Sequence, residues 1–260
     1  MKIYIAHSKD IPYQTELYQP IRDNKSLEVD EIILPHETNA HRSNTREFYQ
    51  TIDCFIAECT MPSTGLGIEL GWAYDNHKRI YAIHKSGSEI SSSIKSVTSK
   101  IYSYSSKEEM IQLIQKIIRE VKEDKTMKVV GTMFFKDQKL LIDKPRKRST
   151  YQMIGGRVEE GETPKEAAIR ECHEELGPKA TFQEEQINPV MEFDEVATSD
   201  GVTPIHFYVF EYLGNLEGEL STSDEIEKFL WYETTYGTDI LSNTLKQEVV
   251  PYCLQKRKIR

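Results

Sequence analysis

The sequence predicts two consecutive domains: an α/β domain built on a parallel sheet, then an α+β domain in which a helix packs on a mixed sheet. Three observations predict this organisation. Short apolar runs alternate with helix-compatible segments in the first half of the chain, a charged segment at 122–126 lacks apolar residues, and strand-like runs dominate after it. The predicted domains are residues 1–124 and 127–260.

Four apolar runs of the first domain have the length and composition of buried strands: 3–6, 30–34, 54–57 and 79–83. Polar segments that are compatible with helices separate them. This alternation is typical of a parallel sheet covered by helices. Ser106 is placed to cap the helix that follows, since apolar residues recur after it at helical spacing. These residues are Met110, Ile111, Leu113, Ile114, Ile117, Ile118 and Val121.

The second domain opens with the pattern of a β-hairpin over residues 128–142, with its turn at Asp137 and Gln138. Strand-like runs then alternate with longer helical segments, which is typical of an α+β domain. The further elements predicted here are two strands and two helices: 187–193, 205–213, 163–176 and 239–254.

The composition is that of a globular protein, with 38% hydrophobic and 29% charged residues among 260. A formal net charge of −9 argues against nucleic acid as the main partner, because such binding uses Lys and Arg to neutralise phosphates. No stretch approaches the ~18 apolar residues of a membrane span. The four cysteines have no metal-binding spacing. We therefore expect a cytoplasmic protein with reduced thiols that does not bind a membrane.

The predicted helix over 163–176 carries three glutamates. A Thr-Pro pair at 163–164 marks its start and a Gly-Pro pair at 177–178 marks its end. At about 100° per residue, Glu171, Glu174 and Glu175 fall on one side of this helix. Carboxylates so close repel one another unless a proton or a cation lies among them. Their oxygen atoms suit Mg²⁺ or Mn²⁺, which also bind substrate phosphates.

A solvated helix surface rich in glutamate is the alternative, and three acids alone would favour it. The wider spacing decides against it, because the segment fits the pattern G-x5-E-x7-R-E-U-x-E-E-x-G-U, where U is apolar. This pattern is the Nudix box, and the second domain resembles the Nudix hydrolase family, whose fold is an α/β/α sandwich with a mixed sheet. The matching residues are Gly156, Glu162, Arg170, Glu171, Glu174, Glu175 and Gly177. Cys172 fills one apolar position, and Pro178 departs from the last one.

The resemblance implies a role for each of these residues. The three glutamates of the box are expected to be catalytic and to bind Mg²⁺ or Mn²⁺, with the Gly155 carbonyl as a further ligand. Arg170 is expected to orient the glutamates and Glu162 to tie the loop to the helix, whereas Gly156 and Gly177 are structural. A water activated by the metal or a glutamate would attack phosphorus. Glu175 is the expected base, and Glu225 from a later loop is the alternative.

A second constellation follows the predicted strand at 54–57. This strand leads into a polar loop with a proline, Ser63 and two glycines, before a helix predicted to begin near Gly67. Loops at the carboxyl ends of parallel strands are where open α/β sheets bind ligands. Ser63 and the backbone N–H groups are placed to bind a phosphate. Glu69 is predicted in the first helical turn, facing the crevice. The alternative is a glutamate that only stabilises the helix dipole.

The residues of this constellation fit the pattern D-x4-E-x-x-x-P-S-x-G-x-G-x-E-x-G-x-A of the nucleoside 2-deoxyribosyltransferase superfamily. The domain most resembles the branch that hydrolyses 2'-deoxynucleoside 5'-monophosphates at the N-glycosidic bond. The matching residues are Asp53, Glu58, Pro62, Ser63, Gly65, Gly67, Glu69, Gly71 and Ala73. The resemblance covers about residues 1–105 and implies a Rossmann- or flavodoxin-like parallel sheet. One departure is that the glycine- and arginine-rich turn of this branch is absent at residues 6–10.

Carried over to this chain, the resemblance implies that Glu69 is the nucleophile that attacks C1' of the sugar. Asp53 would position or protonate the departing base, and Tyr4 would border the nucleophile. Ser63 would bind the 5'-phosphate, with two glycines of the same loop at the substrate: Gly65 and Gly67.

Together the two resemblances predict a bifunctional enzyme that acts on a small nucleotide. Its Nudix domain would convert a nucleoside triphosphate into monophosphate and pyrophosphate, and its first domain would cleave or transfer the N-glycosidic bond. One alternative is an ADP-ribose or nucleotide-sugar pyrophosphatase whose first domain only binds the ribosyl part. An alternative of another class is a nucleotide sensor. Relatives of the first domain often associate, so a homodimer is compatible with this interpretation.

Overall fold

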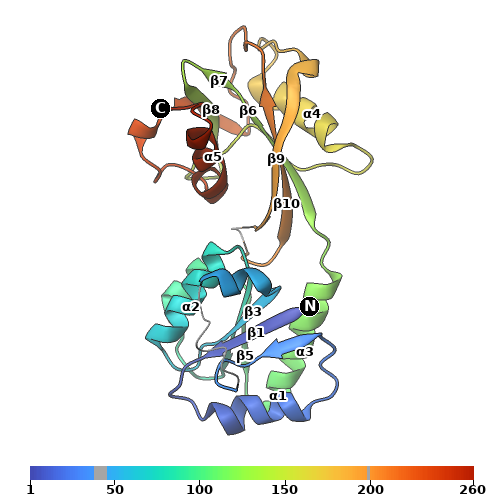
Figure 1. Ribbon diagram of the computed structural model, residues 1–260, viewed down its shortest axis with the longest axis vertical. Coiled ribbons are helices and arrows are strands. Elements are labelled where there is room, and N and C mark those ends of the chain that lie inside the picture. Colours follow the sequence, from blue (N-terminus) through green and yellow to red (C-terminus); the bar gives the residue numbers. More distant parts are fainter. Residues whose placement is uncertain (38–45, 198–199) are drawn as a thin grey trace. The chain divides into compact units, whose positions relative to one another are not determined.

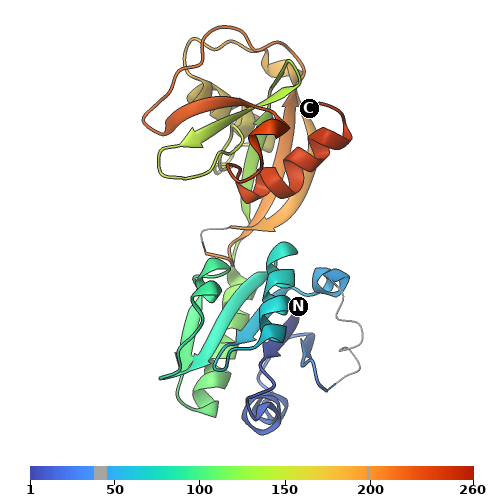
Figure 2. The same cartoon turned by 90° about the vertical axis from the view of Figure 1, so that its left-hand side faces the viewer.

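The computed structural model describes residues 1–37, 46–197 and 200–260, and the chain forms two compact units (Figures 1 and 2). The first unit contains Met1–Thr126 and also Asp194–Ile205. The second contains Met127–Phe193 and His206–Arg260. Within the described residues no helix is long and apolar enough to cross a membrane.

The first unit contains a five-stranded sheet in the order β2-β1-β3-β4-β5, and all its neighbouring strands are parallel. The strands are β1 Lys2–His7, β2 Glu31–Ile33, β3 Cys54–Glu58, β4 Arg79–Lys85 and β5 Ile101–Tyr104. This confirms the predicted parallel α/β sheet. The order is that of a flavodoxin-like fold, in which the crevice at the carboxyl ends of β1 and β3 is the usual ligand site.

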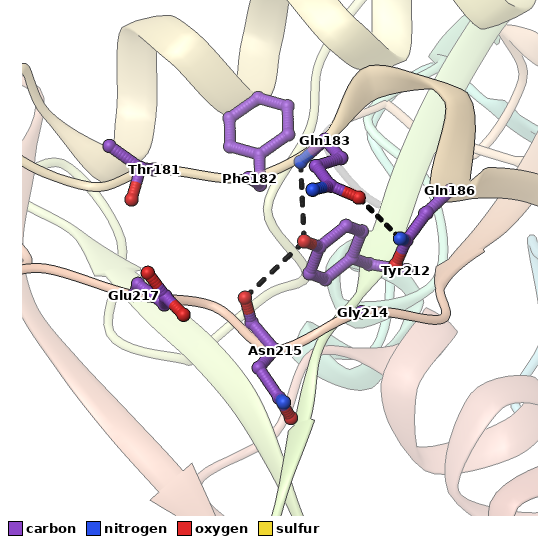
Figure 3. A pocket seen from close by; sticks show the side chains of 8 residues that line it. All are labelled: Thr181, Phe182, Gln183, Gln186, Tyr212, Gly214, Asn215 and Glu217. Carbon is purple, nitrogen blue, oxygen red and sulfur yellow. Dashed lines mark hydrogen bonds between the residues drawn. The ribbon is translucent and has the colours of Figure 1, made fainter.

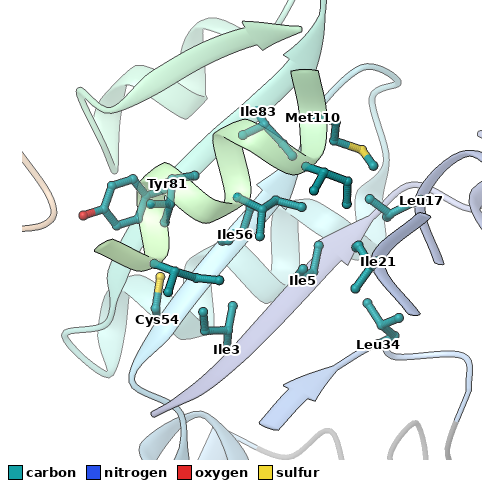
Figure 4. Packing of buried hydrophobic residues seen from close by; sticks show 14 of the residues in the cluster. Ile3, Ile5, Leu17, Ile21, Leu34, Cys54, Ile56, Tyr81, Ile83 and Met110 are labelled. Atoms are coloured by element: carbon teal, nitrogen blue, oxygen red, sulfur yellow. The ribbon is translucent and has the colours of Figure 1, made fainter. Parts of the chain in front are cut away.

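Helices cover both faces of this sheet. The helices are α1 Gln19–Asp23, α2 Thr64–Asp75 and α3 Lys107–Glu123, with a π-helical turn at Gln14–Tyr18 and 3-10 turns at Arg46–Thr51 and Ser92–Ser96. Side chains alternate along each strand, so Ile3 and Ile5 pack toward α1 and α3, whereas Tyr4 and Ala6 pack toward α2. Figure 4 shows the first of these cores. As predicted, Ser106 caps α3, and its Oγ accepts a hydrogen bond from the Glu109 N–H.

The stretch Asp194–Ile205 belongs to the first unit through its backbone. The Gly201 carbonyl accepts a hydrogen bond from Ile80 N at 3.0 Å, and the Asp200 carbonyl accepts one from Ser99 N at 3.0 Å. Val202 is 2% exposed within the core of α1 and α3. The first unit is therefore completed by residues that the sequence assigns to the second domain.

The second unit contains two three-stranded sheets, with the orders β6-β10-β9 and β11-β8-β7. The strands are β6 Met127–Met133, β7 Phe135–Lys136, β8 Lys139–Pro145, β9 Ile187–Val196, β10 Pro204–Tyr212 and β11 Ile226–Tyr232. The helices are α4 Pro164–Leu176 and α5 Val250–Gln255, with a π-helical turn at Leu245–Val249 and 3-10 turns at Glu184–Gln186 and Thr234–Tyr236. Mixed strands with a packed helix confirm the predicted fold class.

The segment 151–157 connects the two sheets of this unit. It forms single bridges to β8 at Asp143↔Gln152 and to β6 at Thr132↔Ile154. One face of α4 packs on the core beside it, and four of its side chains are buried there: Ala167, Ala168, Cys172 and Leu176. The polar residues of α4, among them Arg170, Glu171 and Glu175, lie on another face of the helix, which contacts segment 151–157.

Candidate functional site

The ends of α4 are fixed by the residues that the sequence indicates. Thr163 and Glu166 form a capping box: the Thr163 hydroxyl accepts from Glu166 N at 3.3 Å, and Glu166 Oε2 accepts from Thr163 N at 2.7 Å. Pro164 occupies the first turn. Gly177 ends the helix at φ +87°, where any other residue would be strained. These ends set the rotation of the glutamate face.

Arg170 is the centre of an ion-pair network on this face. Its guanidinium donates to Glu162 at 2.8 and 3.2 Å and to the Arg157 carbonyl at 2.9 Å. It also donates to Glu171 at 2.9 Å and to Glu174 at 3.3 Å. Its hydrogen bond holds the pKa of Glu162 below the usual value. Through these hydrogen bonds Arg170 joins Glu162, in the loop before the helix, to α4.

Two consecutive glycines let the carboxylates approach the backbone of segment 151–157. A Cβ on Gly156 would lie 2.3 Å from Glu171 Oε1, so this carboxylate lies directly over the glycine. Gly155 has φ +151°, and a Cβ there would lie 2.1 Å from the Val130 carbonyl. Its N–H donates to Glu175 Oε2 at 2.6 Å. The predicted role of the Gly155 carbonyl as a metal ligand stays a prediction.

The environments of the three glutamates differ. The Glu171 side chain is 14% exposed, and burial raises its pKa above the usual value although Arg170 opposes the shift. The Glu174 side chain is 59% exposed. Burial raises the pKa of Glu175 to about 9, and the nearby charge of Asp143 raises it further than those of Glu171 or Glu225. Of these three acids, Glu225 has the smallest effect on the pKa of Glu175.

Asp143 was not expected at this site. It lies on β8 with 0% exposure, and burial raises its pKa to about 8. The signal in the sequence is one acidic residue directly after the apolar run Leu140-Leu141-Ile142. Asp143 is bridged to segment 151–157 at Gln152 and exerts the largest charge effect on Glu175, so we include it in the candidate site.

The predicted ligands are not gathered around one point. Throughout residues 1–37, 46–197 and 200–260, no three acidic, histidine or cysteine side chains are arranged to bind a metal ion. Arg170 donates hydrogen bonds to two of these carboxylates, those of Glu171 and Glu174. The donors nevertheless fit Mg²⁺ or Mn²⁺, because they are carboxylates and because Asp143 is buried with both oxygens unpaired.

Comparison with known proteins assigns this unit. Residues 125–236 match the family model of the NUDIX domain. This stretch is a Nudix domain. Three solved structures are similar to it: the E. coli ORF135 protein, a MutT NUDIX hydrolase from Burkholderia pseudomallei, and a UDP-X diphosphatase. The comparison with curated proteins found no match.

The likeness to these three structures is distant. The identities are 19%, 19% and 18%, and the TM-scores are 0.42, 0.41 and 0.39. The alignments cover 52%, 47% and 58% of this chain and 94%, 95% and 81% of the other chains. At these scores they identify no substrate.

Two open grooves of the Nudix domain contain none of the predicted residues. One, of about 590 Å³, is lined by Asp137, Gln138, Lys139 and Arg260. The other, of about 410 Å³, includes Gln183 and Tyr212 (Figure 3). There the Tyr212 hydroxyl accepts from Gln183 N at 3.2 Å and donates to the Asn215 carbonyl at 3.3 Å. These hydrogen bonds join a loop to β10 and supply no reactive group.

In the first unit, Glu69 lies among tyrosines. The hydroxyl of the fully buried Tyr4 donates to Glu69 Oε1 at 2.9 Å. Burial is the main cause that raises the pKa of Tyr18 and Tyr49 above the usual value. The charge of Glu69 raises both pKa values by a smaller amount. The predicted neighbourhood of Tyr4 and Glu69 is thus present.

The start of α2 differs from the expected one. The helix begins at Thr64 rather than near Gly67, so Glu69 lies in the second turn and the first turn contains no acid. The reason is that Ser63 takes the extended backbone of an N-cap and both glycines are accommodated in the helix. A helix dipole acts mainly within the first turn, so it does not account for Glu69. The Ser63 hydroxyl makes no capping hydrogen bond.

Asp53 lies at the other end of β3. It precedes the strand, whereas Ser63, Gly65 and Gly67 follow it. The Asp53 carboxylate accepts from Lys2 N at 2.6 Å and is 57% exposed. The acid at the carboxyl end of β3 is instead Glu58, which is buried and accepts from the Tyr104 hydroxyl at 2.9 Å. The structure therefore brings Tyr4 to Glu69 but does not bring Asp53 to the Ser63 loop.

Proposed function

We propose that the Nudix domain is a metal-dependent hydrolase that cleaves the diphosphate linkage of a small nucleotide, and that it converts a nucleoside triphosphate into monophosphate and pyrophosphate. The arrangement of the box supports this proposal. Arg170 joins the Glu162 loop to α4, and Glu171 and Glu175 reach the Gly155–Gly156 backbone. Four acids lie close together beside segment 151–157: Asp143, Glu171, Glu174 and Glu175. Because their negative charges repel one another, such a cluster is better suited to bind a cation than to remain uncompensated on the surface.

We propose a separate role for each residue of the box in this reaction. Glu171, Glu174 and Glu175 would hold Mg²⁺ or Mn²⁺, which when bound polarises a phosphate and activates water. Arg170 would fix the orientation of Glu171 and Glu174. The raised pKa of Glu175, about 9, leaves it protonated at neutral pH. Glu175 can therefore accept a proton only after a neighbouring positive charge has lowered this pKa.

The test is product analysis with the full chain, Mg²⁺, and a panel of deoxynucleoside triphosphates, ADP-ribose and nucleotide sugars. Glu174→Gln should abolish hydrolysis, whereas Glu219→Gln, which changes an exposed glutamate paired with Lys179, should leave it unchanged. If wild type hydrolyses only ADP-ribose or a nucleotide sugar, the triphosphate proposal fails. If it hydrolyses nothing and Glu174→Gln still binds nucleotide, the protein is a sensor.

We also propose that Glu69 is the nucleophile of an N-glycosidase or deoxyribosyltransferase in the first unit. The hydrogen bond from Tyr4 to Glu69 supports it, together with a Ser63 hydroxyl not used as a helix cap. A Glu69 oxygen would attack C1', and the C1'–N bond would break with its electron pair leaving on the base. Water or a second base would then release the sugar from Glu69.

The monophosphate made by the first reaction is the substrate class of the second. Free base should therefore form from a deoxynucleoside triphosphate with wild type, whereas Glu69→Gln should stop at the monophosphate. Tyr4→Phe should slow base release and leave pyrophosphate release unchanged. If monophosphate accumulates and base never forms with wild type, the coupling is refuted.

A further inference from the structure

Asp143 is a buried acid without a hydrogen-bonding partner for its carboxylate. Its backbone is paired in both directions with Gln152, at 3.0 and 2.8 Å. Its side chain is 0% exposed, and no hydrogen bond of normal geometry reaches either oxygen, although Gln152 lies near enough to lower its pKa slightly. Leaving a buried carboxyl group unpaired costs stability. Packing in β8 alone would favour an apolar residue, as at the three preceding positions.

The surroundings of Asp143 connect it to the glutamates of the box. Gln152 lies opposite it in a single bridge between β8 and segment 151–157. Three residues further along this segment, Gly155 N donates to Glu175 Oε2 at 2.6 Å. Asp143 also exerts the largest charge effect on Glu175. Arg148 is the cation whose charge acts on Asp143, but no ion pair joins these two described residues.

We propose that Asp143 is a fourth carboxylate of the metal site and that it binds one divalent cation together with Glu175. This inference rests on the proposed metal dependence of the Nudix domain. Two carboxylates neutralise one divalent cation, and oxygen ligands of this kind select Mg²⁺ or Mn²⁺. The cation would also occupy the unpaired oxygens of Asp143. Arg170 already forms hydrogen bonds to Glu171 and Glu174, whereas Arg148 lowers the pKa of Asp143 only through its charge and makes no ion pair with it among the described residues.

The experiment is a Mn²⁺ titration of the full chain without nucleotide, in which electron paramagnetic resonance measures free Mn²⁺. Thermal melting with and without Mn²⁺ is a second readout. Asp143→Asn keeps the size of the side chain and removes its ability to give up a proton and bind a cation as a carboxylate. It should weaken Mn²⁺ binding at least ~10-fold, the lower end of what supporting groups of metal sites contribute. Mn²⁺ should raise the Tm of wild type and leave the Tm of Asp143→Asn unchanged.

The matched control is Glu211→Gln. Glu211 is 6% exposed on β10 and accepts from Lys258 at 2.5 Å, so it is a buried acid that has its own partner. Its Mn²⁺ affinity should equal that of wild type. Should Asp143→Asn not fold, as judged by circular dichroism, Asp143→Ser is measured in its place with the same expectations.

Glu175→Gln separates this inference from the function on which it rests. If Glu175→Gln loses Mn²⁺ and the Asp143 variant binds it as wild type does, Asp143 is not a ligand and the inference is overturned, while the metal-dependent function stands. If both variants bind Mn²⁺ like wild type, the proposed metal site itself fails. Loss in both, with normal binding in Glu211→Gln, supports the inference.

Discussion

Gly155→Ala should destabilise the Nudix domain more than the same change at Gly156 or Gly161. At φ +151° the alanine backbone would be strained, which costs about 1–3 kcal/mol. Its Cβ would also lie 2.1 Å from the Val130 carbonyl oxygen and 2.8 Å from Gly131 Cα. These are backbone atoms of β6 that cannot turn away, so overpacking adds about 1–3 kcal/mol. The expected loss is about 2–6 kcal/mol.

The same substitution at Gly156 and at Gly161 distinguishes the cost of backbone strain from the cost of a steric clash at Gly155. A Cβ on Gly156 would meet only the far end of Glu171, at 2.3 Å, and this carboxylate can swing aside. Gly156→Ala should therefore displace Glu171 and reduce activity, with less than about 1 kcal/mol lost. Gly161 has φ +92° and no atom within 4 Å of an added Cβ. Gly161→Ala should lose only about 1–2 kcal/mol from the left-handed backbone.

The assay is thermal melting of the three variants in the full chain, followed by circular dichroism, together with product release at a temperature where all are folded. At about 4 °C per kcal/mol for a domain of this size, Gly155→Ala should melt about 8–24 °C below wild type. Gly156→Ala should melt close to wild type and be the least active of the folded variants. Equal melting of Gly155→Ala and Gly161→Ala would refute the collision with Val130.

Three further predictions follow from the same structure. Burial raises the pKa of Glu175 to about 9 and that of Asp143 to about 8, so the folded state binds protons more tightly than the unfolded state. The metal-free protein should therefore lose stability between about pH 4 and pH 9, and urea midpoints across this range should fall less steeply in Glu175→Gln. Thr163→Ala removes the capping box and should cost about 1 kcal/mol in denaturant unfolding, whereas Thr163→Ser should cost less. Gly201→Ala puts a Cβ 2.4 Å from the Val97 carbonyl oxygen at φ +73°. Strain and overpacking together should lower the free energy of unfolding of the first unit by about 2–6 kcal/mol, and calorimetry should show this unit unfolding at a lower temperature.

Local patterns in the sequence predict the parts of the site that are themselves local. The Thr163-Pro164 start and the Gly177 end fix α4, and with it the rotation that places Glu171 and Glu175 on one face. The ion pair between Arg170 and Glu162 follows from the family spacing. Apolar runs of four or five residues likewise predict four of the five parallel strands of the first unit, because strands buried on both faces are apolar throughout. The fifth strand, β5 Ile101–Tyr104, is not predicted, because this edge strand is only partly buried and carries polar residues.

The remaining features depend on contacts between distant segments. An acid after an apolar run looks like an exposed strand end, yet Asp143 is buried because segment 151–157 bridges to β8 at Gln152. Glycines at 65 and 67 suggest a loop, but Ser63 starts α2 ahead of them. Asp53 precedes β3, and its carboxylate accepts a hydrogen bond from Lys2 at the start of β1. This contact depends on the pairing of β1 with β3, which the local sequence around Asp53 does not reveal.

The four acids beside segment 151–157 are balanced in two ways in the absence of metal. Arg170 supplies positive charge to Glu171 and Glu174 through the ion pairs that it forms with both carboxylates. Glu175 has only the Gly155 N–H, and Asp143 has no hydrogen bond, so protons must neutralise them, in accord with their raised pKa values. A divalent cation that binds at Glu175 displaces protons rather than an arginine. Metal uptake should therefore release protons into the buffer while Arg170 keeps its hold on Glu162, so that the loop stays joined to α4 in both states.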